Sequence, residues 1–153
     1  MDAASRQDLI AQYTAGPATV VAALEGITET ELDARPAPDE WTVREIVHHL
    51  ADSEMTLAIR LRRLLAEEHP QIVGYDEAEY ARRLYYDRPI DSSLNVLRSA
   101  RAASASLLER LTEEQWQCAG THNERGRYTV EDWLTIAVGH VRDHADQIRR
   151  ARQ

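Results

Sequence analysis

The sequence predicts an all-α protein built as a four-helix bundle, with short extra helices in the connections. Three observations favour this fold. Glycine and proline are scarce, with six and five residues in 153, whereas alanine, leucine, glutamate and arginine are abundant. Apolar residues recur at helical spacing in four long segments, and the segments between them are short. The length suits one domain covering residues 1–153, and 43% apolar residues suffice for its core.

The first helix is expected over residues 5–24, where apolar side chains keep the helical period until Gly26 offers a stop. Gly16-Pro17 interrupts this pattern and predicts a kink or a split, because proline lacks the backbone donor of a helix interior. Residues 30–32 then form one short turn.

The second helix has the clearest start. Thr42 followed by Glu45 predicts a capping box, in which the two side chains bond reciprocally to free backbone amides. Trp41, just before it, can pack onto the first turn. The helical period then continues to about His69-Pro70, through Val43, Ile46, Val47, Leu50, Leu57, Leu61 and Leu64.

The second half of the chain predicts two more long helices. Residues 76–86 can form a short covering helix with Tyr80, Leu84 and Tyr85 facing inward. Asp91-Ser92-Ser93 is expected to cap a third helix reaching Leu111, and residues 112–116 form another short turn. Residues 120–128 are polar and are expected to be a loop. The last helix begins at Thr129 and continues through Ile148 to a basic end, Arg149-Arg150.

Charge and cysteine content exclude several function classes. The net charge of −8 argues against a nucleic-acid partner, and the arginine clusters at 60–63 and 149–152 are read as solvated helix faces. No apolar run approaches the roughly 20 residues of a membrane span, and the N-terminus does not resemble a signal peptide. Cys118 is the only cysteine and lacks an activating neighbour. We therefore expect a cytoplasmic protein without a membrane partner.

His140 and His144 are the first candidate site residues. Four positions apart on the last helix, they present their imidazoles one turn above the other on one face. Unpaired polar groups that face a core cost roughly 1–3 kcal/mol, and a metal ion would provide the missing partner. The alternative is a partly exposed pair, one of them bonded to Asp143 or Asp146.

A third ligand has to come from another helix. His49 borders the apolar stripe of the second helix, whereas His48 lies on a more polar face where Asp52 can accept its proton. We therefore choose His49. His69 and His122 fall in terminal or loop positions and are expected to be exposed. Three histidines without a fourth protein ligand are typical of an open, reactive metal site.

Two separated motifs resemble the DinB-like superfamily, and most closely its YfiT-like branch of metal-dependent hydrolases, which includes bacillithiol transferases. The first motif is the run from Trp41 to Ser53, WTVREIVHHLADS, and the second is HxxxHxxxI from His140 to Ile148. The likeness continues between them through Ile59-Arg60, Glu67-Glu68, Tyr75-Asp76-Glu77 and Leu111-Thr112-Glu113-Glu114-Gln115, so it covers most of the chain.

The resemblance implies an up-down-down-up bundle and one metal ion bound by His49, His140 and His144, the residues also chosen from spacing. Close relatives are richer in histidine around the last pair, where this chain has Val141-Arg142-Asp143. The resemblance does not distinguish two reactions. The metal can lower the pKa of a bound water to about 7 for hydrolysis, or it can bind a low-molecular-weight thiol as the thiolate of an S-transferase.

Several further expectations remain open alternatives. Zinc is the expected ion, with nickel or iron next. The carboxylates of Glu45, Asp52 and Asp143 can accept hydrogen bonds from the second ring nitrogens of the ligand histidines, or they serve only as capping and surface groups. The expected partners are a small-molecule substrate, for which a low-molecular-weight thiol is one candidate, and a second copy in a homodimer. A non-catalytic metal-binding module and a purely structural bundle are the competing functional interpretations.

Overall fold

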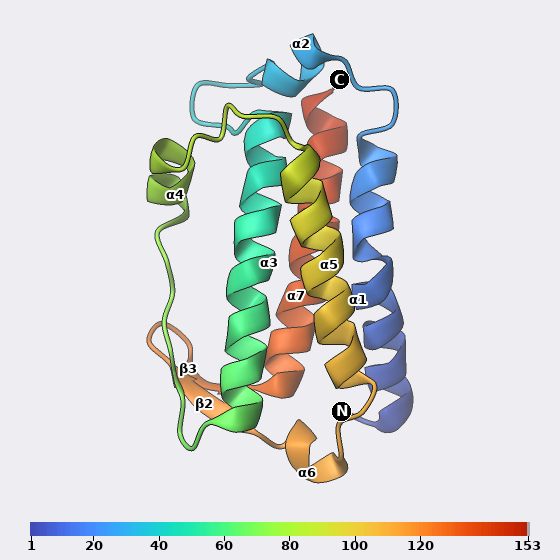
Figure 1. Ribbon diagram of the computed structural model, residues 1–153, viewed down its shortest axis with the longest axis vertical. Coiled ribbons are helices and arrows are strands. Elements are labelled where there is room, and N and C mark those ends of the chain that lie inside the picture. Colours follow the sequence, from blue (N-terminus) through green and yellow to red (C-terminus); the bar gives the residue numbers. More distant parts are fainter. Residues whose placement is uncertain (153) are drawn as a thin grey trace.

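The computed structural model describes residues 1–152 and shows the predicted four-helix bundle (Figure 1). The long helices are α1 (Ala3–Ala23), α3 (Val43–Ala66), α5 (Asp91–Leu108) and α7 (Val130–Ala151). The connections contain the short helices α2 (Glu29–Asp33), α4 (Glu77–Arg83) and α6 (Glu113–Trp116). Both the bundle and the extra helices were expected.

The bundle has the up-down-down-up topology. In Figure 1, α1 and α7 run upward and α3 and α5 run downward. The parallel helices α1 and α7 pack against each other, as do α3 and α5. The connection from α3 to α5 must therefore return along the whole bundle, and it carries α4 past the outer side of α3 (Figure 1). This return places a covering segment beside α3.

Capping boxes start the two helices that carry the candidate ligands. Thr42 accepts from the backbone N–H of Glu45, and the Glu45 carboxylate accepts from the backbone N–H of Thr42. Thr129 and Asp132 make the same pair of bonds at the start of α7. The caps fix where each helix begins, and hence which side chains point inward.

Other helix ends differ from the predictions. Asp91-Ser92-Ser93 does not cap α5: Asp91 is its first helical residue, and Ile90 precedes it without a side-chain cap. Helix α3 ends at Ala66 and α5 at Leu108, in each case before the predicted end, because the apolar period alone does not show where a last turn unwinds.

Helix α1 is neither split nor ended by Pro17, contrary to one of the two expected outcomes. Because Pro17 has no N–H, the Tyr13 carbonyl lacks its usual helical donor, and Arg101 Nη1 donates to that oxygen at 2.8 Å. A Cβ on Gly16 would lie 2.0 Å from Arg101 Nη1. The Gly-Pro pair therefore provides both the space and the acceptor for a buried arginine.

That arginine belongs to a polar layer in the middle of the bundle. Arg101 and Glu54 are each 1% exposed and form an ion pair at 2.8 Å, and Tyr13 donates to the other Glu54 oxygen. Apolar clusters pack on both sides of the layer. One contains Leu57, Leu61, Leu108, Trp116, Tyr128, Trp133 and Leu134, and the other contains Val20, Leu32, Ile46, Leu50, Leu97, Val141 and Ile148.

Each long helix buries one face and exposes the other. On α7 the buried side chains recur every three or four residues: Val130, Trp133, Leu134, Ala137, Val138, Val141, Ala145 and Ile148. Within residues 1–152, no helix has both the length and the hydrophobicity needed to cross a membrane.

The expected polar loop at 120–128 is instead a β-hairpin. Strands β2 (Ala119–His122) and β3 (Gly126–Thr129) pair antiparallel, and β1 (Gln71–Ile72) pairs parallel with β2. Gly120 lets the strands approach, since a Cβ there would lie 2.4 Å from the Pro70 carbonyl oxygen. The prediction was wrong because residues 119–129 lack a clear alternating pattern, and β2 also pairs with β1, which lies far away in the chain. His122, expected to be exposed, is only 4% exposed.

The tyrosines of the covering segment also differ from expectation. Tyr80 and Leu84 are exposed and Tyr85 is 79% exposed, so their predicted inward orientation is wrong. Helix α4 ends at Arg83, and Tyr85 has a left-handed φ of 53°, so the helical period does not continue. Tyr86 turns inward instead, and its hydroxyl donates to Asp52 Oδ2 at 2.7 Å.

Candidate metal centre

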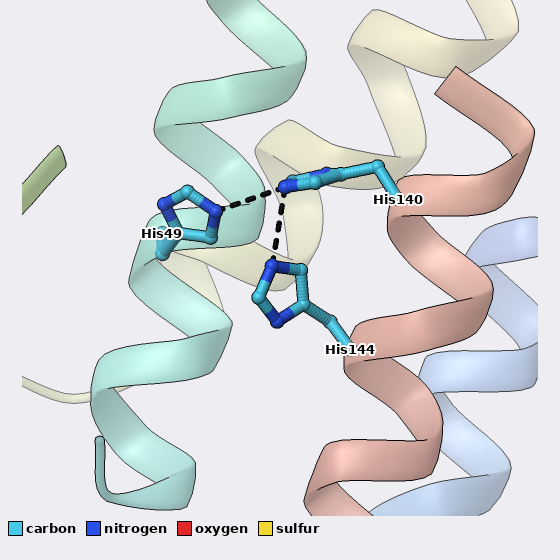
Figure 2. A group of neighbouring side chains, drawn as sticks. All are labelled: His49, His140 and His144. Atoms are coloured by element: carbon cyan, nitrogen blue, oxygen red, sulfur yellow. Dashed lines mark hydrogen bonds between the residues drawn. The ribbon is translucent and has the colours of Figure 1, made fainter. Parts of the chain in front are cut away.

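The structure brings His49, His140 and His144 together inside the bundle (Figure 2). His140 lies between the other two: its Nε2 is 2.9 Å from His49 Nε2 and 3.1 Å from His144 Nε2. One nitrogen from each ring falls within 4.8 Å of the others. Residues separated by about ninety positions in the sequence therefore share one small volume.

The antiparallel contact of α3 with α7 explains this meeting. Descending from its cap at Thr42, α3 reaches His49 at the level where ascending α7 presents His140 and His144 (Figures 1 and 2). Trp41 packs beside them. Its ring meets the His49 ring edge-on at 4.7 Å between centroids and stacks with His144 at 6.4 Å. The residue expected only to staple the helix start also forms a wall of the site.

Burial keeps all three imidazoles neutral. Desolvation, followed by the proximity of the other imidazoles, lowers the pKa of His49 to about 3. Desolvation, His144 and then Arg101 lower the pKa of His140 to about 3. Burial also lowers the pKa of His144. At neutral pH each ring therefore has one N–H and one nitrogen lone pair, the form that binds metal ions.

The hydrogen bonds of these rings favour a cation between them. His144 Nδ1 lies 2.8 Å from the Gln147 side-chain oxygen, so its hydrogen belongs on Nδ1 and its Nε2 is a lone pair. His140 Nε2 faces two Nε2 atoms but can carry only one hydrogen. His49 Nδ1 is buried without a partner. Since the three rings cannot satisfy one another, this donor set fits a divalent transition metal ion.

Comparison with known proteins identifies the family. Residues 12–148 match the model of the DinB superfamily. The chain belongs to the DinB superfamily. A relative from Oceanobacillus iheyensis is 34% identical over 122 residues, covering 80% of this chain and 71% of the relative. YfiT of Bacillus subtilis is 35% identical over 135 residues, covering 86% and 75%. Both relatives carry the name "putative metal-dependent hydrolase".

The solved structure of YfiT from Bacillus subtilis superposes on this fold. The TM-score is 0.93 at 30% identity, and the match covers 99% of this chain and 87% of that one. That protein is described as "a probable metal-dependent hydrolase with an unusual four-helix bundle topology". The resemblance inferred from the two sequence motifs is therefore confirmed, and so is the fold class.

The three carboxylates considered as supports of the ligands have other partners. Glu45 caps α3 and pairs with Arg35 at 2.7 Å. Asp52 accepts from Tyr86, and the exposed Asp143 lies against Arg142 at 3.3 Å. Within residues 1–152, none of the three forms a hydrogen bond with a ligand imidazole. The capping and surface roles, given as the alternative, describe Glu45 and Asp143.

Gln147 takes the supporting role instead. It lies on α7 one turn after His144, so the same helix provides both the ligand and the group that orients it. Its position three residues after a predicted ligand was the available signal. An amide oxygen is a less common partner of a ligand histidine than a carboxylate, so the sequence favoured the acidic neighbours over Gln147.

Glu77 is a second residue that the sequence did not assign. Its Oε2 lies 4.0 Å from His49 Nε2, and its side chain is 52% exposed. Burial raises the pKa of this carboxyl, and the positive charge of Arg60 opposes the shift. Glu77 comes from α4, so its approach depends on the course of the long return connection. Local sequence patterns do not specify that course.

The remaining histidines lie outside the cluster. His48 is fully buried rather than on a polar face: its Nδ1 is 2.7 Å from Ser93 Oγ and its Nε2 is 2.9 Å from the Arg88 carbonyl oxygen. The expected partner, Asp52, was therefore wrong. His48 instead ties α3 to the start of α5. His69 is exposed, as expected.

Proposed function

We propose that this protein is a metal-dependent enzyme acting on small molecules, with one divalent transition metal ion bound by His49, His140 and His144. The observation that carries this proposal is the convergence of three neutral imidazole nitrogens that cannot satisfy one another. The names of the relatives support a metal-dependent hydrolase.

The donor set supports an open site. Three protein ligands are typical of catalytic zinc, whereas structural zinc sites have four. Neutral imidazoles suit zinc first, and nickel or iron next. A bound divalent ion supplies Lewis acidity, which activates water or stabilises a thiolate at neutral pH.

The side chains around the site have complementary tasks. Gln147 holds the His144 ring in the tautomer that directs its Nε2 lone pair inward. Trp41 packs against two of the imidazoles and excludes water from that side. The Glu77 carboxylate approaches from α4 and can accept a hydrogen bond from a molecule bound beside His49.

The first test is metal content. Untagged protein purified without metal-affinity resin should contain about one divalent ion per chain by elemental analysis. His49→Ala, His140→Ala and His144→Ala should each reduce this to background. His69→Ala is the matched control, because His69 is exposed and lies outside the cluster. Full metal content in all three ligand variants would rule out this centre.

The second test separates the reactions. We propose hydrolysis as the activity, so zinc-loaded protein should cleave members of a panel of small esters and amides, and His140→Ala should not. In parallel, bacillithiol, mycothiol or glutathione is incubated with a chlorinated aromatic. An adduct with one of these thiols, without hydrolysis, would assign an S-transferase instead. Stoichiometric metal without either reaction would indicate a binding module.

A further inference from the structure

A cavity of about 150 Å³ begins at His140 and extends toward the β-hairpin. His49, Ser53 and Arg60 lie four and then seven residues apart, so they share one face of α3. On α7, Ile136 precedes His140 by one turn, and both line the cavity. The space is therefore continuous with one ligand of the candidate metal centre, and Arg60 lies farther along the same helix.

Arg60 is a cation in this cavity without an anionic partner. One of its terminal nitrogens donates to the Val73 carbonyl oxygen at 2.7 Å. Its Nε is buried and has no hydrogen-bond partner, and within residues 1–152 it makes no ion pair. By contrast, Arg63, three residues further along α3, forms an ion pair with Glu67. A buried, unsatisfied guanidinium nitrogen is costly, so its acceptor is expected to come from a ligand.

Tyr75 offers a second free donor in the same cavity. Its hydroxyl is buried without a hydrogen-bond partner, although Ser53 is close by. Burial raises the pKa of Tyr75 to about 12, so the hydroxyl remains a donor at neutral pH. Arg60 and Tyr75 both line this cavity, and a guanidinium beside a phenol forms a suitable site for a carboxylate.

The acidic residues of the cavity do not cancel this field. Glu77 and Glu124 line its mouth, but both are exposed, so water and salt screen their charges. Arg60 lines the cavity together with a second cation, Arg125, and the charges of both add to burial in lowering the pKa of His122. The two arginines match the two carboxylates in number, so the cavity has no net negative charge to repel an oxyanion.

We propose that this cavity binds the carboxylate of a small-molecule substrate, with Arg60 and Tyr75 as its donors. This inference deepens the proposed function, because it names the substrate class of the same site: small acids whose reacting group extends toward His140. Arg60 sets specificity here and holds no part of the metal centre.

The test is a titration of the full-length protein, as purified, with butyrate, 1-butanol and inorganic phosphate. The readout is the side-chain Nε–H resonance of Arg60 in proton–nitrogen NMR spectra. Butyrate should shift this resonance saturably, and the alcohol of equal length should not. Binding of phosphate tenfold tighter than butyrate would overturn the assignment to a carboxylate, and so would equal shifts with butyrate and butanol.

Two variants test whether butyrate binds at Arg60 and Tyr75, and their butyrate affinity is measured by calorimetry. Arg60→Gln should weaken butyrate binding at least tenfold, and Tyr75→Phe, which removes a hydroxyl without partners, several-fold. Arg63→Gln is the control and should bind as the wild type does. If Arg60→Gln and Tyr75→Phe each bound butyrate with unchanged affinity, the inference would be overturned. Because none of these measurements needs a metal ion or turnover, their failure is distinguishable from a failure of the proposed activity.

Discussion

The bundle interior contains two polar clusters that differ in how well they are satisfied. In the layer formed by Tyr13, Glu54 and Arg101, the guanidinium donates to Glu54 and to the carbonyl oxygens of Tyr13 and Ala137. Tyr13 completes the layer by donating to Glu54. Every side-chain group of this cluster therefore has a partner within the protein.

The histidine cluster is different. One Nε2 faces two other Nε2 atoms, and His49 Nδ1 has no partner. Both clusters are buried in the bundle, the first among all four long helices and the second between α3 and α7. Burial of polar residues alone therefore does not distinguish a structural cluster from a functional one. The distinction lies in what remains unsatisfied: the first cluster is complete, whereas the second leaves nitrogen atoms that a cation would satisfy.

The largest expected effect is a loss of stability in the complete cluster. Arg101→Met would leave the buried Glu54 carboxylate without its charge partner and two carbonyl oxygens without a donor. We expect the free energy of unfolding to fall by about 3–5 kcal/mol. Urea denaturation of metal-free protein measures this change. A loss below about 1 kcal/mol would mean that the layer is not a structural unit.

The pH dependence of stability should report the histidine cluster. Because the pKa values of His49 and His140 are about 3 in the folded protein, against an ordinary value of 6.5, the unfolded state binds more protons between pH 6.5 and 3. The free energy of unfolding should therefore fall with decreasing pH, by up to about 1.4 kcal/mol per histidine per pH unit.

Urea denaturation of metal-free wild type and His49→Leu at pH 7 and pH 5 isolates this contribution. The variant should lose less stability between the two values than the wild type does. Parallel losses in the two proteins would show that these imidazoles are not kept neutral by burial.

A smaller effect is expected from the orientation of His144. Gln147→Leu removes the acceptor of His144 Nδ1–H, which should weaken zinc affinity about 10- to 100-fold. Gln147→Glu restores an acceptor and should recover most of the affinity. A competition titration with a chelating indicator gives both values. Equal affinities in Gln147→Leu and wild type would assign Gln147 a packing role only.

The smallest stability effect should come from the incomplete cluster itself. His140→Leu replaces an unsatisfied imidazole with an apolar side chain of similar size, so metal-free protein should change by less than about 1 kcal/mol. The rise in Tm on adding zinc should disappear. A loss as large as that of Arg101→Met would remove the contrast between the two clusters, because His140 would then be a structural residue.

Local signals in the sequence were sufficient to select the three histidines that meet in the structure. The capping boxes at Thr42 and Thr129 set the helix starts, and the helical period then oriented His49, His140 and His144. These features depend on neighbours within a few residues, so one sequence can reveal them. The family resemblance supplied the topology, which local patterns alone do not specify.

Features that depend on distant segments were missed. Arg101 is buried because Gly16-Pro17 provides space and an acceptor on another helix. The hairpin lacks a clear alternating pattern and is held partly by the backbone of residues 70–72. Glu77 reaches His49 only through the return connection. In each case the stabilising partner lies far away in the chain.

X-ray absorption at the zinc edge of the loaded protein decides whether three imidazoles from two helices bind one metal ion. We expect three imidazole nitrogens at about 2.0–2.1 Å, with the remaining positions filled by oxygen donors. The count should stay at three in His69→Ala, whereas His49→Ala should retain too little zinc to give a spectrum. A wild-type spectrum with one imidazole, or with a fourth protein ligand closing the site, would contradict this three-histidine centre.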